Sequence, residues 1–203
     1  MRPPILPDDV SYTFADYFRL RIDIEELLIH FGYAYQVANY CLPRSTRLLE
    51  RLPDLRNRIE ESLPYVSLNN ELARREFLIA PVLLEVVHYT QAKIRTEFPI
   101  SVSAQLKGTV DYYVQQANNL LIVEAKNADL QQGFVQLAVE LVAFDQWLTP
   151  DAPLLYGAVS MGNIWQFGIL DRMAKQITQD FNLFRVPADL DDLMPILVAI
   201  LAD

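Results

Sequence analysis

The sequence contains one cysteine, Cys41, and only 6 glycines and 2 histidines among 203 residues. A single cysteine excludes both an internal disulfide framework and a cysteine-based zinc site, so we expect Cys41 to be a small buried or half-buried thiol. The few glycines form no Gly-x-x-x-x-Gly-Lys loop, which excludes that type of phosphate-binding site. His30 and His88 lack the acid and hydroxyl partners that would suggest a catalytic triad, so we expect both to be structural.

Long apolar runs are also absent. No segment approaches the roughly 18 residues needed to span a bilayer, and Met1 to Pro4 do not begin a basic and then apolar signal sequence. We therefore expect a cytoplasmic protein without a membrane partner. The hydrophobic share of 52% and the charged share of 21% are typical of a globular chain, and its length fits one compact domain or a domain with a helical extension.

Positive charge is scarce. The chain has 17 basic and 26 acidic residues, a net charge of −9, whereas nucleic-acid binders usually carry a basic surface. This balance weighs against tight, unassisted binding of DNA. The best local basic cluster consists of five arginines: Arg44, Arg47, Arg51, Arg56 and Arg58. On a helix the first three would share one face, which is either a solvated face or a track for phosphates.

Helix-like and strand-like patterns alternate along the chain. We expect helices at about 45–62, 69–92 with an interruption at Pro81, 129–148, 172–184 and 191–202. Thr13 with Asp16 is typical of a helix start, and residues 23–30 fit either a helix or a strand. The expected strands are 33–42, 94–106, 108–115, 120–126, 154–160 and 164–170.

Strands flanked by helices predict an α/β sandwich. Leu120 to Val123 is apolar on both faces, as in a central strand covered by helices on both sides. We expect residues 1–68 to form a mainly helical N-terminal extension packed on a core of residues 69–203, and the two parts to make one compact unit.

Two of these strands end in charged residues that packing does not explain: Asp111 on the first, Glu124 and Lys126 on the second. Alternation places Glu124 and Lys126 on one face. If the intervening turn is centred between Ala117 and Asn118, Asp111 lies opposite Glu124, where like charges repel. A divalent cation between the carboxylates would turn that repulsion into binding. The alternative is a plain cross-strand ion pair between Asp111 and Lys126, which contributes little.

This pattern resembles the PD-(D/E)XK nuclease superfamily, in which an Asp on one core strand is followed by Glu-x-Lys at the end of the next. The resemblance implies a restriction endonuclease-like three-layer sandwich, with a central mixed sheet between helices. Glu85 stands where many members carry an acid on the preceding helix. Gln136 stands where several branches carry a Gln on the following helix, and Glu140 replaces the Tyr that often accompanies it.

The resemblance further implies hydrolysis of phosphodiester bonds in DNA with Mg (or Mn). Asp111 and Glu124, with Glu85, would bind the metal; Lys126 would assist water attack; Gln136 would be auxiliary. Hard oxygen ligands of this kind suit magnesium on chemical grounds as well. Two alternatives stay open. One is a nuclease-like binding or assembly subunit that does not cleave, with the apolar helix 190–201 as a homodimer or partner face. The other is hydrolysis of a different phosphate ester at the same site.

Overall fold

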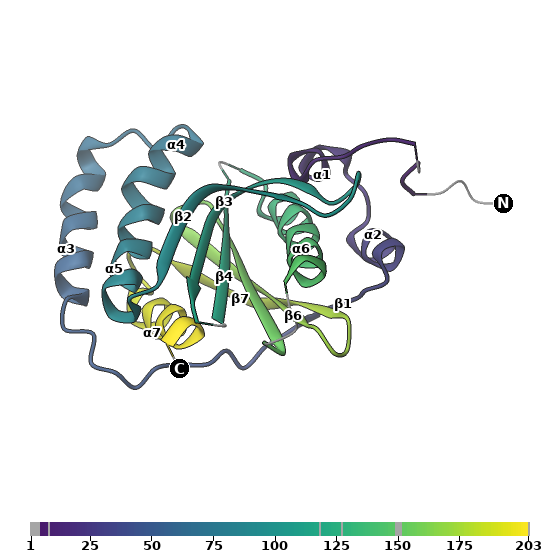
Figure 1. The fold of residues 1–203 in the computed structure, drawn as a ribbon. Coiled ribbons are helices and arrows are strands. Elements are labelled where there is room, and N and C mark those ends of the chain that lie inside the picture. Colours follow the sequence, from purple (N-terminus) through teal and green to yellow (C-terminus); the bar gives the residue numbers. More distant parts are fainter. Residues whose placement is uncertain (1–4, 8, 118, 127, 149–151, 203) are drawn as a thin grey trace.

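The computed structural model describes residues 5–7, 9–117, 119–126, 128–148 and 152–202. Its centre is one seven-stranded mixed sheet with the strand order β1-β7-β6-β5-β4-β3-β2 (Figure 1). The strands are β1 (Ala34–Ala38), β2 (Lys93–Ser101), β3 (Lys107–Gln116), β4 (Asn119–Ala125), β5 (Leu154–Ser160), β6 (Ile164–Asp171) and β7 (Gln176–Arg185). The pairs β1/β7 and β4/β5 are parallel, and the other four pairs are antiparallel.

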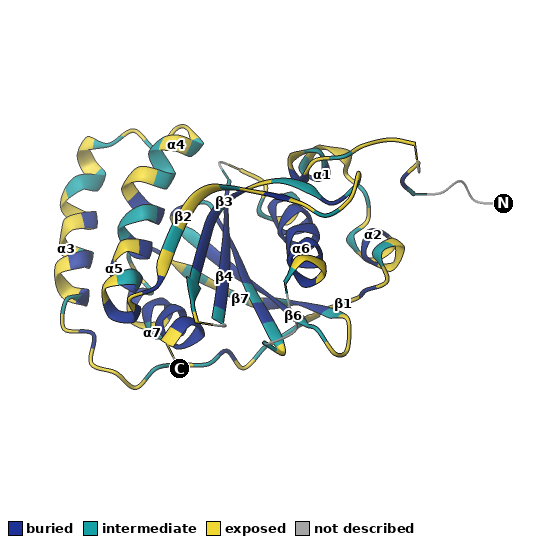
Figure 2. Ribbon diagram, viewed as in Figure 1, coloured by how far each residue is buried: buried dark blue, intermediate teal, exposed yellow. Residues whose placement is uncertain are grey.

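Helices cover both faces of this sheet, so the predicted α/β sandwich is confirmed. One face carries α1 (Phe14–Leu20), α2 (Ile24–Phe31) and α6 (Leu130–Trp147). The other carries α3 (Leu52–Ser62), α5 (Ala80–Thr90) and α7 (Leu190–Ala202), with the short η1 (Leu63–Tyr65), α4 (Glu71–Arg74) and the π-helical η2 (Arg75–Ile79) between α3 and α5. Buried residues line the sheet and the helix faces turned toward it (Figure 2).

The core is divided into two clusters by β4. Leu121 and Val123 pack on the side of α5 and α7, whereas Leu120 and Ile122 pack on the side of α6. All four side chains are buried, as the apolar run in this strand predicts. Because β4 is covered on both faces, Glu124 near its end is buried against Gln136 of α6.

The order α5, β2, β3, β4, α6, β5 positions the ends of β3 and β4. The three strands form an antiparallel meander, and α6 crosses back so that β5 runs parallel to β4. Asp129 caps α6 as predicted, since its Oδ1 accepts a hydrogen bond from the Gln132 backbone at 3.1 Å. The capping box of Thr13 and Asp16 at the start of α1 is also confirmed.

Several sequence expectations were wrong. Residues 172–184 are not a helix: Gln176–Arg185 forms β7, which hydrogen-bonds to β6 on one side and to β1 on the other. A segment whose hydrophobic pattern fits both a helix and a strand takes the structure that its neighbours in the sheet impose. The strand expected at 33–42 is present as β1, which joins the same sheet, so residues 1–68 contribute a strand as well as helices. Cys41 is exposed rather than buried.

The helix expected over 69–92 begins at the Asn70 cap and is interrupted as predicted, but by a π-helical segment. Pro81 lies in the first turn of α5, directly after η2. Proline lacks the N–H that a continuous helix needs at this point, and a wider π turn accommodates that loss. Helix α3 begins at Leu52 rather than near Ser45, so the non-helical segment before it is longer than expected.

The C-terminal helix α7 was expected to offer an apolar partner face, and this was wrong. Its large apolar residues are buried against α3, α5 and the sheet, and nine of its thirteen residues are buried. The hydrophobic stripe of α7 is therefore core. None of the described helices is long and apolar enough to cross a membrane. The residues Met1 to Pro4 and Asn118, used in two of the expectations above, lie outside the described residues.

Candidate functional site

The predicted register of the β3–β4 hairpin is confirmed. Tyr112 pairs with Val123, and the pairing continues to Gln116 and Asn119 at the turn. The pairing ends at Tyr112 and Val123, and Asp111 and Glu124 are the next residues of the two strands, where the same register would place them opposite each other. The Asp111 side chain links the two strands here, because its Oδ2 accepts a hydrogen bond from the Ala125 backbone N–H at 2.8 Å.

Glu124 and Lys126 lie on one face, as alternation predicts, and they form an ion pair with each other. Glu124 is 2% exposed, and the Lys126 side chain is 12% exposed. Burial lowers the pKa of Lys126, but Glu124 and Asp111 more than offset this effect, so its pKa is raised. Lys126 is therefore a charged ammonium group held at the end of β4.

Helix α6 adds two side chains to this group. Gln136 Nε2 donates hydrogen bonds to Glu124 Oε1 at 2.6 Å and to Glu140 Oε1 at 2.9 Å. The helix approaches closely because Gly133 faces the strands: a Cβ at Gly133 would lie 2.7 Å from Val159 and 3.0 Å from Lys126. Any larger residue there would push Gln136 away from Glu124.

The carboxylates of this group are held in an unfavourable environment. Burial raises the pKa of Glu124 to about 7, an effect increased by Asp111 and opposed by Lys126. Burial and the nearby Glu124 raise the pKa of Glu140 well above its usual value. Burial also raises the pKa of Asp111, against the Ala125 N–H, Arg75 and Lys126. Crowded, desolvated carboxylates of this kind favour a bound proton or cation.

Arg75, which the sequence reasoning missed, reaches the group from η2. Its Nη1 lies 3.2 Å from Asp111 Oδ1 and 2.6 Å from Glu97 Oε1, and its guanidinium covers the Tyr112 ring. The β2–β3 register places Glu97 opposite Asp111. Glu97 has a φ of 49°, which is unusual inside a strand. π-helical turns and left-handed residues both occur often at functional sites.

The group opens onto a cleft of about 650 Å³, which we name the α1–α4 cleft. Its lining includes Phe18 and Arg19 of α1, Arg21, and Glu71 of α4, together with Lys126, Gln132 and Gln136 at the end of β4 and the start of α6. In Figure 1, α1 and α4 stand on opposite sides of the ends of β3 and β4. Burial raises the pKa of Glu71, and Lys126 opposes this shift.

The structure does not bring Glu85 to Asp111 and Glu124. Glu85 is 2% exposed on α5 and faces α3, where it forms ion pairs with Arg51 at 3.0 Å and Arg58 at 3.2 Å. The helical acid that lines the cleft is Glu71. Both acids precede the strands in the sequence, but Glu71 lies at the start of α4 and Glu85 lies on α5, beyond the π-helical η2. The sequence feature that could have pointed to Glu71 is the helix cap at Asn70, the residue directly before it.

The arginine cluster is not a free basic track. Arg51 and Arg58 hold Glu85, and Arg47 donates to the carbonyl oxygen of Tyr89. The other two pair with the first turn of α7: Arg44 with Asp192, and Arg56 with Asp191. These side chains tie the segment 44–58 to α5 and α7, so neither a plain solvated face nor a phosphate track describes them.

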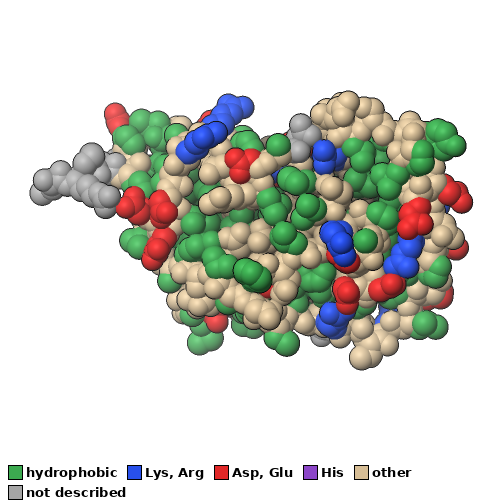
Figure 3. Space-filling view, turned by 180° about the vertical axis from the view of Figure 1, so that it is seen from behind, with side chains coloured by type: hydrophobic (Ala, Val, Ile, Leu, Met, Phe, Trp, Pro, Cys, Tyr) green, Lys and Arg blue, Asp and Glu red, His purple; other side chains and the backbone are tan. Residues whose placement is uncertain are grey.

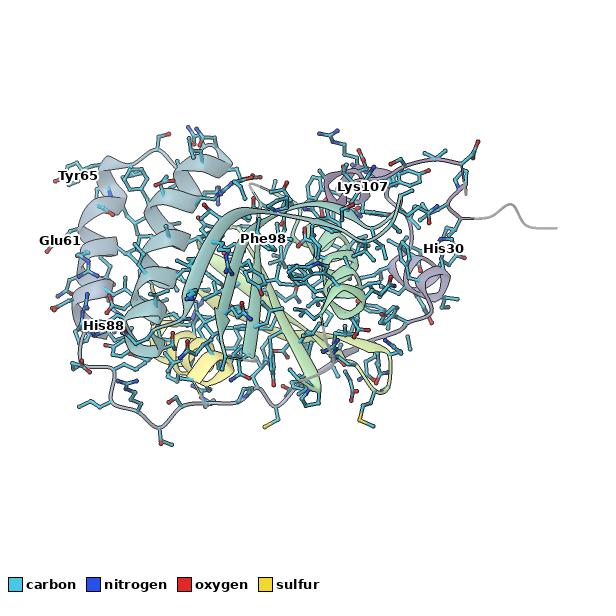
Figure 4. All side chains as sticks on the ribbon, in the orientation of Figure 1. His30, Glu61, Tyr65, His88, Phe98 and Lys107 are labelled. Carbon is cyan, nitrogen blue, oxygen red and sulfur yellow. The ribbon has the colours of Figure 1, made fainter. Side chains whose placement is uncertain are left out.

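The two histidines also lie apart from the group. His30 on α2 and His88 on α5 are on opposite sides of the molecule (Figure 4). His30 Nε2 contacts Gln105 Oε1 at 3.1 Å, and His88 lies 3.9 Å from Glu50. Neither contact provides a nucleophile with a base.

Comparison with family models, with curated proteins and with solved structures found no match. The residues themselves must therefore indicate the chemistry.

Within the described ranges, no group of three or more His, Cys, Asp or Glu side chains is arranged to hold a metal ion. The donor set nevertheless fits a hard cation. Glu124 Oε2 and Glu140 Oε2 are buried, and no N–H or hydroxyl group of the described residues donates to either; the two carboxyl groups lie close enough to share a proton. Buried acceptors are normally paired, and carboxylate oxygens are the ligands that magnesium prefers. A cation at Asp111 would have to displace Arg75 from its Oδ1.

Proposed function

We propose that this protein is a Mg-dependent (or Mn-dependent) phosphodiesterase of the PD-(D/E)XK type that acts on DNA. The observation that carries the proposal is the meeting of Asp111, Glu124 and Lys126 at the ends of two paired strands, beside an open cleft. The element order helix, three strands, helix, strand agrees with the restriction endonuclease-like core that the sequence resemblance implies.

In this proposal Asp111 and Glu124 hold the metal, with Glu140 as a buried neighbour. A bound magnesium ion would lower the pKa of a water molecule and neutralise charge on the scissile phosphate. Gln136 orients Glu124, because its amide nitrogen is bonded to that carboxylate and to Glu140. Glu71 replaces Glu85 as the auxiliary acid, since only Glu71 lines the cleft.

Lys126 supplies a fixed positive charge where the cleft meets the carboxylates. Its ammonium group pairs with Glu124 and lies 5.1 Å from the centre of the Phe18 ring. A donor held in place before the substrate arrives stabilises charge as it develops on a phosphoryl oxygen. Lys126 also lines the α1–α4 cleft, so a substrate there can reach it.

The test is cleavage of labelled DNA by the purified chain with magnesium, with manganese and with a chelator. We expect metal-dependent products from the wild type, and a loss of about 100-fold or more in Lys126→Ala with folding retained by circular dichroism. Lys93→Gln is the matched control, because Lys93 is exposed and pairs with Gln115 at the opposite end of β3. Full activity in Lys126→Ala would contradict the role of Lys126.

A second candidate function is a nuclease-like subunit that binds or assembles without cleaving. The observation in its favour is that the protein's own cations already contact the carboxylates: Arg75 contacts Asp111, and Lys126 contacts Glu124. Calorimetry with manganese separates the two candidates. Binding that is lost in Asp111→Asn supports the enzyme, whereas no heat of binding at millimolar metal supports the subunit.

A further inference from the structure

We propose that the α1–α4 cleft takes a single, unpaired nucleic-acid strand rather than a duplex. This inference rests on the proposed function, because it names the form of substrate that reaches Asp111, Glu124 and Lys126. Three features of the cleft carry it: the chemistry of the α1 wall, the size of the space, and an unsatisfied acceptor on its floor.

The wall formed by α1 combines an aromatic ring with cations. Phe18 is half-buried and lines the cleft, and Arg19 and Arg21 are exposed beside it. Within the described residues no salt bridge is formed by Arg21 or by Arg19, although the charge of Arg19 interacts with that of Asp16 on the same helix. Proteins that bind single strands use this combination, because bases stack on the ring while the cations contact the backbone.

The size of the cleft argues against a duplex. Pockets of about 300–1,000 Å³ enclose ligands of small-molecule size, and this cleft of about 650 Å³ is bounded by both α1 and α4. A nucleotide of an extended strand fits such a space. A paired base is stacked between its neighbours, and it can reach Phe18 only if it is first taken out of the helix.

The floor of the cleft offers one specific contact. Gln136 is 3% exposed and lines the cleft, and its Oε1 has no hydrogen-bond partner within the described ranges. Its Nε2 is already held by Glu124 and Glu140. Because this oxygen is itself buried, a donor on the ligand, such as the N3–H of thymine, can reach it only if the Gln136 side chain shifts toward the cleft.

The rest of the described surface gives a duplex little to bind. A duplex footprint needs a run of unpaired Lys and Arg along the phosphates, but the arginines of the 44–58 segment are engaged within the protein. On the face shown in Figure 3, basic side chains are scattered and most lie beside acidic ones. The cations of the cleft are therefore local, which suits a short stretch of one strand.

The experiment measures binding by fluorescence anisotropy in a buffer that contains calcium. Two labelled probes are compared: an oligothymidylate of about ten nucleotides, and a hairpin duplex that contains the same thymidine strand. We expect the single strand to bind about ten-fold more tightly. Phe18→Leu keeps apolar bulk but removes the ring, and Arg21→Gln removes an exposed charge. Each should weaken binding of the single strand about five-fold or more, whereas Lys93→Gln should not.

Equal or tighter binding of the duplex would overturn the inference, as would a folded protein that binds neither probe. Because Arg21 is exposed, Arg21→Gln remains a valid test even if Phe18→Leu loses stability. The inference and the proposed function fail separately. If the protein binds the single strand but shows no metal-dependent cleavage, only the proposed enzymatic function is contradicted. If it cleaves the duplex and has no preference for single strands, only the inference about the form of the substrate is contradicted.

Discussion

Arg75 Nη1 lies 3.2 Å from Asp111 Oδ1, so a guanidinium covers the carboxylate expected to bind the metal. The same nitrogen lies 2.6 Å from Glu97. Arg75 thus has a second anion to hold if Asp111 is taken by a cation. The raised pKa of Asp111, caused first by burial, indicates that Arg75 compensates its charge only in part.

Replacing Arg75 should make cation binding tighter. In Arg75→Gln, Asp111 and Glu124 lose a competing positive charge, and we expect the manganese affinity measured by calorimetry to rise about five-fold or more. Arg95→Gln makes the same change on β2, where the arginine packs over Phe98 and Tyr113, and should leave the affinity unchanged. Weaker binding in Arg75→Gln would show that Arg75 supports the site instead.

The left-handed backbone at Glu97 predicts an unusual ranking of substitutions. Glu97→Ala and Glu97→Gly both remove the contact with Arg75, but only glycine accepts a φ of 49° without strain. We expect Glu97→Gly to be more stable than Glu97→Ala by about 1 kcal/mol in urea denaturation. At Thr96, which pairs regularly with Tyr112, alanine should be better than glycine. If glycine and alanine ranked in the same order of stability at Glu97 and at Thr96, the result would argue against a strained backbone at Glu97.

Glu85 and Glu71 should respond in opposite ways. Glu85→Ala leaves Arg51 and Arg58 without their buried partner, so we expect a loss of about 2 kcal/mol in unfolding free energy and normal metal-dependent cleavage by the folded protein. Glu71→Gln, on the cleft, should lower cleavage with little loss of stability. A cleavage defect in folded Glu85→Ala would restore Glu85 as a site residue.

The pH dependence of stability should report on Asp145, far from the cleft. Burial raises the pKa of Asp145, but hydrogen bonds from Lys175, Tyr33 and Arg172 more than offset this, so its pKa is lowered. A group with a lowered pKa stabilises the fold above its unfolded value and loses that stabilisation as the pH falls through the folded value.

We therefore expect Asp145→Asn to be less stable than the wild type near neutral pH, and the difference to shrink below about pH 4. Urea denaturation across this pH range provides the measurement. Asp54→Asn, at an exposed position of α3, is the control for loss of one carboxylate. A difference that stays constant with pH would show that Asp145 acts through packing alone.

Sequence patterns predicted the hairpin and its register correctly because the relevant residues are neighbours in the chain. The turn length sets which residues of β3 and β4 pair, and the alternation along β4 sets the common face of Glu124 and Lys126. The cap at Asp129 likewise acts on the next three residues. Where the pattern was mixed, as in Gln176–Arg185, the sheet decided and the prediction failed.

By itself, then, the sequence determined the paired strands, the caps of α1 and α6, and the gathering of Asp111, Glu124 and Lys126 at one end of the sheet. Only the tertiary structure decided which distant groups join them. Gln136 and Glu140 meet Glu124 through the packing of α6, and Arg75 meets Asp111 through the turn before α5. Glu85 turns to α3 instead. Local geometry follows from adjacent residues, whereas the rotation of a helix depends on every surface it packs against.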